Sequence, residues 1–524
     1  MEMIETCKSP FITLISPQKL GSHSSDFYIG RGGAPPLNLA YLSRALDNAN
    51  ISHEIIDTLA TTHSFTSEAL GLPIHGLSYK EVVRRIPAQT SVIAISSMFT
   101  SEFLIIRELL IYIKEAFPDA LVILGGEHAT AMSAAILKYE DNIDYIIAGE
   151  GETSFVEFIG YLKRDQSYIT KTQGLVYKNE EGDIISNPRA PRLIDIDDFY
   201  PLWDKIPVHY YNENRLSLSR VNLRGMPILA TRGCPYRCTF CSNEQMWGTR
   251  YVMRSVDSIM KEMKEAVEKY KIEHFDFLDL STSINKKWFK SLLEALITEL
   301  PGITWEMSVG TRSEILDEEI LDLLKRSGTT QITYAPESGS PKISKMIKKK
   351  LNLNKMYHSV KAASSLGMEV KSNTIIGFPR ENIWDLLLTI KMAFKLGWLG
   401  TKNVCIFVFS AYPGSELFDE EYQINKMTKH EYENYMQYYT ENTAGARIFD
   451  ITEVMKYPRE QIYTLIGNLV TVMAYIICTL KRPYMYRDLY LNLKNGRPKG
   501  PVEQGLYSLI KKISLPRASE VRHE

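Results

Sequence analysis

This sequence has few cysteines and almost no net charge. Its first residues do not resemble a secretory leader. Six cysteines in 524 residues are too few for a disulfide framework, which indicates a reducing compartment such as the cytoplasm. The formal net charge of −1 gives no general attraction to polyanions, so nucleic acid is not a predicted partner. The first residues, MEMIETCKSP, lack the basic stretch and following apolar stretch of a secretory signal. We therefore expect a cytoplasmic protein.

One long run lacks formal charge, and it extends over Ile462–Leu480 ahead of Lys481 and Arg482. Its length approaches that of a membrane span. Polar residues nevertheless recur along it at helical spacing, namely Thr464, Asn468, Thr471, Tyr475 and Thr479. Because these residues form a polar stripe on one helical face, we predict a buried or interfacial helix rather than a span.

Apolar strands alternate with helices over residues 1–165, which predicts a parallel sheet covered on both faces. The expected strands are Phe11–Ile15, His53–Asp57, Ser91–Ser96, Ala120–Leu124 and Ile143–Ala148. Ligands of such sheets bind beyond the carboxyl ends of the strands. The residues that fall there are Ser96, Ser97, Gly125, Gly126, Gly149, Glu150 and Gly151.

A second βα series is expected over residues 226–425, after an irregular linker at 166–225 that is punctuated by proline. Its predicted strands are Ile228–Thr231, His274–Leu280, Thr304–Val309, Gln331–Ala335, Glu369–Ile376 and Asn403–Phe409. Six βα units suggest a barrel or partial barrel, with its chemistry at the carboxyl ends of the strands. Residues 426–524 have no strand pattern and predict a helical C-terminal region, in which Tyr432, Tyr435 and Tyr439 are expected to pack in a core.

Three cysteines lie in one loop after the first strand of this series, as Cys234, Cys238 and Cys241. Three soft thiolates packed this closely predict a metal centre that leaves a four-ligand metal one open position. Structural zinc usually takes a second pair of ligands farther along the chain. The other cysteines, Cys7, Cys405 and Cys478, are isolated. The spacing therefore favours an iron–sulfur cluster over zinc.

The loop resembles the radical S-adenosylmethionine superfamily, in which Cys-x₃-Cys-x-aromatic-Cys follows the first strand of a (βα)₆ barrel. The resemblance implies a 4Fe–4S cluster on Cys234, Cys238 and Cys241, with S-adenosylmethionine on the fourth iron. It further implies that one-electron reduction cleaves this cofactor to a 5′-deoxyadenosyl radical. Phe240 matches the aromatic position beside the adenine. An external electron donor of the flavodoxin or ferredoxin type is implied with it.

Later segments resemble the same superfamily. Glu337 and Ser338 stand in an "ESGS" segment expected to contact S-adenosylmethionine, and Arg312 is similar to a basic residue that can meet its carboxylate. Gly377 lies in a turn that resembles the fifth-strand "GxP" turn. The family often has two acidic residues after the second strand. This chain has only Asp279 there, which leaves the role of that residue open.

The first domain resembles the cobalamin-binding domain that precedes such barrels, through the segments at Gly125–Thr130 and Gly149–Thr153. Other cobalamin domains carry an Asp-x-His-x-x-Gly motif, which is not found here, and His23 does not match it. His128 is expected to be a polar residue that fixes a loop. Cobalt without a protein histidine is therefore implied, and an empty scaffold is the alternative. A methylthiotransferase is disfavoured because the first domain has only Cys7.

These resemblances imply a cobalamin-dependent radical enzyme that methylates an unactivated carbon of a small molecule. Radical cyclisation or oxidation is the alternative within the family, and a non-catalytic iron–sulfur redox sensor is the alternative outside it. The segment at 481–512 carries eight basic and two acidic residues with several tyrosines. Such a segment after an apolar helix suits peripheral contact with the inner face of a membrane and a lipophilic substrate, and a solvated basic face is the other interpretation.

Overall fold

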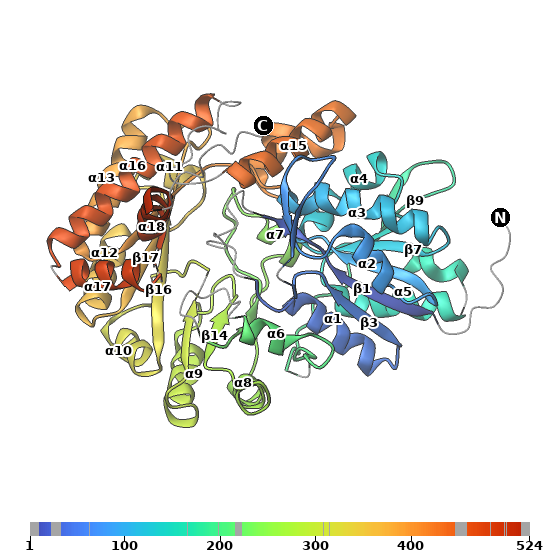
Figure 1. The fold of residues 1–524 in the computed structure, drawn as a ribbon, viewed down its shortest axis with the longest axis horizontal. Coiled ribbons are helices and arrows are strands. Elements are labelled where there is room, and N and C mark those ends of the chain that lie inside the picture. Colours follow the sequence, from blue (N-terminus) through green and yellow to red (C-terminus); the bar gives the residue numbers. More distant parts are fainter. Residues whose placement is uncertain are drawn as a thin grey trace, which may run out of the picture. The chain divides into compact units, whose positions relative to one another are not determined.

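The computed structural model describes most of the chain, in two compact units. The described residues are 10–21, 33–61, 63–164, 166–197, 199–214, 223–307, 309–313, 315–445, 458–482, 484–496, 498 and 500–514. Cys7 and His23 lie outside them. Unit 1 comprises residues 1–309 and 411–444, and unit 2 comprises residues 310–410 and 445–524. The units are described separately, with the colours of Figure 1 following the sequence.

Unit 1 begins with a seven-stranded sheet in the order β10-β9-β8-β7-β6-β1-β3. The five parallel strands are β1 (Phe11–Ser16), β3 (His53–Asp57), β6 (Thr90–Ser96), β7 (Leu121–Gly125) and β8 (Tyr145–Ile147). All five correspond to strands predicted from the sequence. Their apolar runs are continuous because both faces of the sheet are covered.

Helices cover the two faces of this sheet (Figure 1). On one face lie α1 (Leu37–Asn48) and α5 (Gly151–Arg164), and on the other lie α3 (Phe103–Ala116) and α4 (Glu127–Tyr139). The first face holds a hydrophobic core in which side chains of α1 and α5 pack on Ile12, Leu14 and Ile123. The shorter α2 (Tyr79–Arg85) precedes β6. This arrangement exposes the carboxyl ends of the parallel strands as one edge.

The linker predicted at 166–225 is partly regular. Its strands β9 (Leu175–Lys178) and β10 (Ile184–Ser186) form an antiparallel hairpin that extends the sheet from β8. The helix α6 (Val208–Glu213) is fixed by a hydrogen bond of 2.6 Å from Tyr211 Oη to Asp57 Oδ2 at the end of β3. The strands were missed because they are short and lie among prolines. A small sheet was also missed from the sequence, because its strands have only two or three residues each. These strands are β2 (Lys19–Leu20), β5 (Pro73–His75) and β4 (Ser64–Thr66).

Unit 1 also holds the first part of the second βα series. Parallel strands β11 (Gly225–Ile228), β14 (His274–Phe277) and β15 (Thr304–Met307) are accompanied by helices α8 (Val256–Tyr270) and α9 (Lys286–Glu299). The predicted strand Ile228–Thr231 is placed wrongly, because β11 ends at Ile228. The chain then forms β12 (Thr231–Arg232), which pairs antiparallel with β13 (Val252–Met253).

Unit 2 continues the series with three parallel strands. They are β16 (Thr329–Glu337), β17 (Glu369–Ile376) and β18 (Asn403–Val408). The helices α10 (Glu318–Arg326), α11 (Pro341–Met346), α12 (Leu353–Ser365) and α13 (Ile383–Leu399) connect or precede them. Strands and helices therefore alternate through six βα units in all, as predicted.

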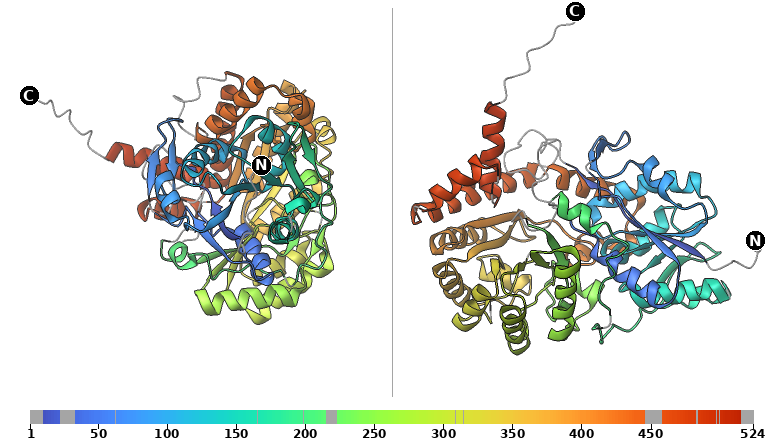
Figure 2. Two further views of the ribbon diagram at one scale, coloured as in Figure 1. Left: turned by 90° about the vertical axis from the view of Figure 1, so that its right-hand side faces the viewer. Right: turned by 60° about the horizontal axis from the view of Figure 1, so that its bottom comes forward.

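The region after residue 426 is helical, as predicted, but it divides between the units. In unit 1, α14 (Glu416–Tyr422) precedes α15 (Lys429–Gly445), on which Tyr432, Tyr435 and Tyr439 are buried. In unit 2, α16 (Pro458–Leu480) packs on α13 and β18. The helices α17 (Tyr484–Lys494) and α18 (Gly500–Ser514) follow it and are drawn in red in Figure 2.

Candidate functional site

The cysteine loop leaves β12 through a glycine that no other residue could replace without strain. Gly233 has φ +81°, and a Cβ built on it would lie 2.4 Å from Arg250 O. Beyond the loop, α7 (Asn243–Trp247) begins, and the Asn243 side chain donates hydrogen bonds to Cys234 O at 3.1 Å and Gly248 O at 3.2 Å. A bond of 3.1 Å from Cys241 N to Cys238 O closes the loop. The loop is thus held at both ends before any ligand binds.

All three loop cysteines are half-buried. Burial raises the pKa of Cys241 to about 12, and the nearby Cys238, Glu127 and Cys234 add to that rise. Within the described ranges, no group of three or more His, Cys, Asp or Glu side chains is gathered closely enough to hold a metal ion. Three thiolates in one loop are a soft donor set, which suits iron–sulfur chemistry, in which the cluster brings its own sulfide and the thiolates bind its iron atoms.

Asp279 braces the strand that leads into the loop. It is buried, and its carboxylate accepts hydrogen bonds from Thr231 Oγ1 at 2.5 Å and from Ala230 N at 3.3 Å. Burial raises its pKa to about 6, against the lowering effect of these bonds. The single acidic residue after β14 therefore positions the turn between β11 and β12.

A buried ion cluster joins the cysteine loop to the edge of the first sheet. Arg232, directly before the loop, pairs through Nη1 with Glu150 Oε1 at 3.0 Å and through Nη2 with Glu152 Oε1 at 2.8 Å. Arg192 Nε contacts Glu150 Oε2 at 2.6 Å. The Arg232 guanidinium also stacks over the ring of Tyr41, 4.6 Å from its centroid. Since breaking such a cluster leaves a buried charge unpaired, it fixes the loop firmly against β8 and α5.

A second contact joins the same parts of unit 1. The Ser242 hydroxyl donates to the carboxylate of Glu127, the first residue of α4. Burial raises the pKa of Glu127, and the bond from Ser242 opposes the rise. Residues from the ends of β7 and β8 thus meet both sides of the cysteine loop.

The residues predicted to bind cobalamin lie at the carboxyl ends of β6, β7 and β8. Gly126 has φ +106°, and a Cβ there would be 2.7 Å from Ser97 O, so glycine is required. A Cβ on Gly125 would find nothing nearer than 3.8 Å, which leaves open space at the end of β7. Ser96 Oγ accepts from Asn38 Nδ2 at 2.5 Å. Ser97 Oγ is buried and has no hydrogen-bond partner among the described residues.

The opposite side of that edge is also glycine-rich. Gly149 has φ +92° and donates its N–H to Thr130 Oγ1 at 3.0 Å, while Gly151 begins α5. An orphaned buried hydroxyl, an open glycine edge and two helix N-termini fit a large flat ligand with polar substituents. The set therefore fits cobalamin.

His128 is buried, and its Nε2 has no hydrogen-bond partner among the described residues. Its Nδ1 lies 3.0 Å from Thr100 Oγ1, and its ring packs on Phe103 with centroids 4.9 Å apart. Burial lowers its pKa to about 3, which keeps the ring neutral. The prediction that it fixes a loop agrees with this bond to the segment before α3.

In unit 2, Glu337 ends β16 in a left-handed conformation with φ +62°. Its buried carboxylate pairs with Lys349 Nζ at 2.9 Å. Lys349 was missed from the sequence because it is the middle member of a run of three lysines, which resembles a solvated face. The pair gives this strand end a carboxylate held away from water, where it can accept from a cationic ligand group.

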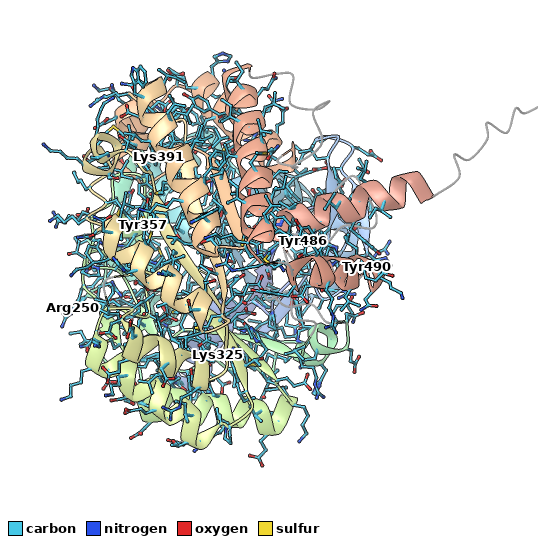
Figure 3. The ribbon with its side chains drawn as sticks, turned by 90° about the vertical axis from the view of Figure 1, so that its left-hand side faces the viewer. Arg250, Lys325, Tyr357, Lys391, Tyr486 and Tyr490 are labelled. Carbon is cyan, nitrogen blue, oxygen red and sulfur yellow. The ribbon has the colours of Figure 1, made fainter. Side chains whose placement is uncertain are left out.

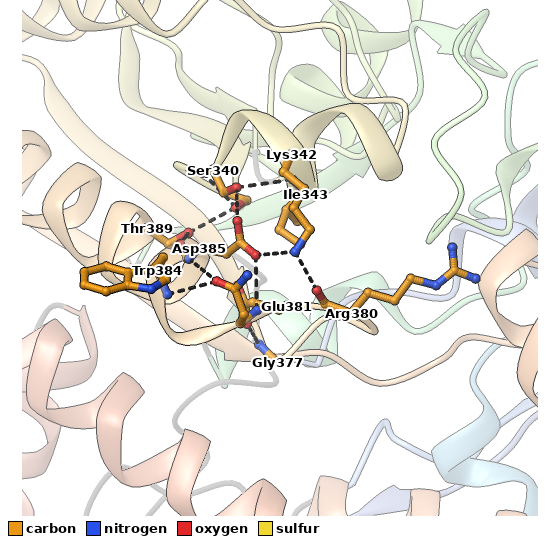
Figure 4. Close-up of polar contacts among 11 residues, drawn as sticks. Ser340, Lys342, Ile343, Gly377, Arg380, Glu381, Trp384, Asp385 and Thr389 are labelled. Atoms are coloured by element: carbon orange, nitrogen blue, oxygen red, sulfur yellow. Dashed lines mark hydrogen bonds and ion pairs between the residues drawn. The ribbon is translucent and has the colours of Figure 1, made fainter.

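The "ESGS" turn is seated on α13 by side-chain hydrogen bonds (Figure 4). Ser338 Oγ lies 3.0 Å from Thr389 Oγ1, and Ser340 Oγ donates to Asp385 Oδ1 at 2.7 Å. Asp385 also pairs with Lys342 Nζ at 2.6 Å. A Cβ on Gly339 would be 2.4 Å from Leu388 O. Ser338 was predicted to touch a cofactor, whereas its hydroxyl here is used to position the turn.

Two other predicted residues of unit 2 have backbone roles. Gly377 follows β17 with φ +82° and donates its N–H to the carboxylate of Glu381. Arg312 donates to Lys350 O through Nη2. Unit 1 thus brings the three cysteines and the edge residues of the first sheet together. The set Arg312, Glu337, Ser338 and Gly377 belongs to unit 2, and Phe240 is in the loop itself.

Two segments of the chain match known protein families. Residues 228–393 match the radical SAM superfamily, and residues 31–159 match the B12 binding domain. A cytidylyl-2-hydroxyethylphosphonate methyltransferase of Streptomyces wedmorensis is 28% identical over 74% of this chain and 77% of its own. An anaerobic magnesium-protoporphyrin IX monomethyl ester cyclase of Cereibacter sphaeroides is 25% identical over 74% of this chain and 60% of its own.

The fold matches a solved structure that contains the expected cofactors. The radical S-adenosylmethionine methyltransferase TsrM from Kitasatospora setae, with cobalamin and a [4Fe-4S] cluster bound, has a TM-score of 0.60. The two sequences are 17% identical, and the structural match covers 79% of this chain and 78% of the TsrM chain. The predicted fold class, a cobalamin-binding α/β domain followed by a radical S-adenosylmethionine domain, is confirmed. The chain belongs to the cobalamin-binding radical S-adenosylmethionine enzymes, whose cofactors are a 4Fe–4S cluster, S-adenosylmethionine and cobalamin.

Proposed function

We propose that this enzyme transfers a methyl group to an unactivated carbon of a lipophilic small molecule. The observation that carries the proposal is the attachment of the cysteine loop to the cobalamin-domain edge through Arg232, Glu150 and Glu152. A reaction that uses both cofactors on one substrate needs their binding sites held together, and this ion cluster holds them within unit 1. The methyltransferase from Streptomyces wedmorensis supports the choice of reaction.

The cluster ligands in this proposal are Cys234, Cys238 and Cys241. S-Adenosylmethionine is bound with the help of Phe240, Arg312, Glu337, Ser338 and Gly377. Glu337 is suited to an amino group because its buried carboxylate already accepts from Lys349. Ser338 acts by positioning the turn through Thr389.

The cobalamin residues in the proposal are Ser96, Ser97, Gly125, Gly126, Gly149, Glu150 and Gly151. The glycines admit the ring, and Ser97 Oγ supplies a buried polar group for its substituents. When bound, these cofactors supply a carbon-centred radical and a methyl carrier. The protein's own residues orient the cofactors and exclude water, because Arg232, Glu150 and Glu152 are buried.

We also propose an electron donor and a membrane contact for this enzyme. The electron donor is an external protein of the flavodoxin or ferredoxin type. The lipophilic substrate reaches the enzyme at a membrane surface, by peripheral contact in the cytoplasm. Support comes from the apolar helix α16, of which Gln461–Leu480 is long and apolar enough to span a membrane by length and composition alone. Only 39% of its most apolar window is buried.

Anaerobic purification tests this function directly. The purified enzyme is expected to show corrin absorption and to form 5′-deoxyadenosine with S-adenosylmethionine and dithionite. Cys238→Ala should lose its iron and this product, whereas Cys405→Ala, in the buried β18, should retain both. An intact cluster without 5′-deoxyadenosine would instead support a redox sensor.

The choice between methyl transfer and cyclisation rests on the product. The cyclase from Cereibacter sphaeroides keeps ring formation as the second candidate. With S-adenosylmethionine labelled by deuterium on its methyl group, methyl transfer gives a product in which one hydrogen of the substrate is replaced by a CD₃ group. Cyclisation gives a product without label. Candidate substrates can be extracted with the enzyme in detergent and identified by mass.

A further inference from the structure

The helix α16 presents its apolar side to solvent and its polar side to the protein. Thr471, Tyr475 and Thr479 of the polar stripe are buried. The exposed positions are all apolar and recur at helical spacing: Ile462, Leu465, Leu469, Met473, Ile476 and Leu480. Leu469 is 64% exposed and Leu480 is 66% exposed. Since a surface helix normally does the reverse, something apolar must cover this side in use.

The buried side of α16 explains why the helix lies on unit 2 and does not leave it. Tyr475 Oη donates to Glu503 Oε1 at 3.2 Å, and Lys402 Nζ pairs with the same oxygen at 2.9 Å. Glu503 is fully buried. Moving α16 into a bilayer would carry the buried hydroxyls of Thr471, Tyr475 and Thr479 into an apolar phase and would break the bond from Tyr475 to Glu503, which is unfavourable. The helix is therefore suited to lie along a membrane surface and not to cross it.

The neighbouring helix α13 extends the apolar surface. A Cβ on Gly397 would lie 2.5 Å from Ala474 O, so α13 and α16 cross at the closest distance that backbones allow. After its first residue, Ile383, the large apolar side chains that α13 exposes are Trp384, Leu387, Leu388 and Trp398, and Trp384 is 72% exposed. We call these four residues and the six exposed residues of α16 the α13–α16 face. Figure 3 views unit 2 from the side on which Lys391 of α13 points outward.

Three exposed lysines lie beside the α13–α16 face. Lys391 and Lys395 are exposed on α13, and Lys481 follows α16 with its Nζ 3.4 Å from the centroid of the Trp398 ring. Over Ile383–Leu399 and Gln461–Leu480 the one carboxylate is that of Asp385, which is buried and paired with Lys342. Tryptophan and lysine around an apolar surface, with no exposed carboxylate in these two segments, are typical of contact with anionic lipid headgroups.

We propose that the α13–α16 face docks on a lipid bilayer that contains anionic headgroups. A second copy of this chain suits the face less well, because a two-fold interface would bring two sets of these lysines into one interface, and neither Ile383–Leu399 nor Gln461–Leu480 offers an exposed carboxylate to pair with them. The inference rests on the proposed membrane contact and assigns it to a different surface. The sequence pointed to residues 481–512, whereas the structure assigns the contact to α13 and α16.

Vesicle binding tests the assignment without any turnover. The full-length enzyme, purified anaerobically, is mixed with vesicles of phosphatidylcholine alone or with phosphatidylglycerol added. We expect it to sediment with the anionic vesicles only. Vesicles of brominated lipid should quench tryptophan fluorescence in the native protein but not in Trp384→Phe/Trp398→Phe, since the remaining tryptophans lie elsewhere.

Matched variants distinguish the α13–α16 face from residues 481–512 as the membrane-binding surface. Leu465→Gln/Leu469→Gln should lower the partition coefficient about tenfold, and Lys391→Glu/Lys395→Glu should do the same. The control Lys325→Glu reverses an exposed charge on α10 and should bind normally, as should Tyr486→Ser/Tyr490→Ser on α17 (Figure 3). Circular dichroism checks that each variant folds.

Three outcomes would contradict the inference in distinguishable ways. If only Tyr486→Ser/Tyr490→Ser releases the vesicles, the membrane contact stands but belongs to residues 481–512. If the native enzyme stays in the supernatant with every vesicle, both the face and the proposed membrane contact fail. If Leu465→Gln/Leu469→Gln instead converts a dimer to a monomer in light scattering, the face belongs to a second copy of the chain.

Discussion

Arg232 Nη1 lies 3.0 Å from Glu150 Oε1, which joins the residue two places before Cys234 to the end of the first parallel sheet. The Arg232 side chain is only 3% exposed. Burial alone would lower the pKa of the guanidinium, but Glu152, Tyr41 and Glu150 raise it above its ordinary range. The contact is therefore a permanent ion pair between the two cofactor-binding parts of unit 1.

Arg232→Ala should destabilise unit 1 by about 3–5 kcal/mol, because it takes the Arg232 ion pair from Glu152 and leaves Glu150 with Arg192 as its remaining ion-pair partner, and both carboxylates are largely shielded from water. Urea unfolding of the anaerobically purified protein, followed by circular dichroism, measures the change. The matched control is Arg224→Ala, which removes the exposed pair of Arg224 with Glu273 and should leave the midpoint unchanged. Equal effects of the two substitutions would show that burial of the Arg232 pair is not decisive.

Gly125→Ala tests whether the end of β7 faces a ligand. A Cβ there would lie 3.8 Å from its nearest neighbour, Ile147 O, so the folded protein has room for it. The thermal midpoint of cobalamin-free protein should therefore be unchanged, while the corrin content after reconstitution should fall. The visible spectrum and the melting curve measure the two effects. Normal cobalamin content in Gly125→Ala would mean that the corrin does not approach this strand end.

Gly339→Ala should destabilise unit 2 by about 1–3 kcal/mol, because the new methyl group would meet Leu388 O at 2.4 Å. The serine turn would then separate from α13, and binding of S-adenosylmethionine should weaken. Gly160→Ala in α5 meets nothing within 4 Å and should stabilise the protein by about 0.5–1 kcal/mol. Opposite signs in thermal unfolding are expected, and a neutral Gly339→Ala would mean that the turn is not tightly seated.

Asp57 should make stability depend on pH. Burial raises the pKa of Asp57 to about 6, although bonds from Tyr211 and Leu59 oppose the rise. The folded chain therefore binds more protons than the unfolded chain between about pH 4 and pH 6. The stabilisation from the protonated carboxyl is complete below about pH 4, and about 3 kcal/mol is lost as pH rises through about 6.

Two variants check this contribution in opposite directions. Asp57→Asn should flatten the dependence of the unfolding free energy on pH in that window. Tyr211→Phe removes the hydrogen bond that lowers the pKa of Asp57, so the loss should move to higher pH. Unfolding midpoints measured from pH 4 to pH 8 test both. An unchanged profile in Asp57→Asn would assign the titration to another group.

Much of the fold was predictable because the residue pattern of most strands and helices is visible within each segment of the sequence. The strands at His53–Asp57 and Glu369–Ile376 were predicted with their observed bounds. The hairpin of β9 and β10 was not, since strands of three or four residues among prolines acquire their structure from the neighbouring β8. Local periodicity carries no information about such a neighbour.

The candidate site was predictable where chemistry is concentrated in one segment. The loop at Cys234–Cys241 needs no distant partner to be recognised. The ion cluster of Arg232, Glu150 and Arg192 joins positions far apart in the sequence, so only the folded chain reveals it. The orientation of α16 was hidden for the same reason. Tyr475 of its polar stripe is buried with a partner, because Glu503 accepts its hydrogen bond and is itself paired with Lys402, and neither residue is near Tyr475 in sequence.

The close crossing at Gly397 has a consequence for related genes. The single hydrogen atom on this residue sets the distance between α13 and Ala474 O, so any side chain at the position would push the helices apart. A homologue with alanine or a larger residue there must hold its equivalent of α16 farther away, and its outer apolar residues would no longer be continuous with those of α13. The residue at the position of Gly397 therefore predicts whether a newly sequenced relative has the continuous apolar surface that we propose faces lipid.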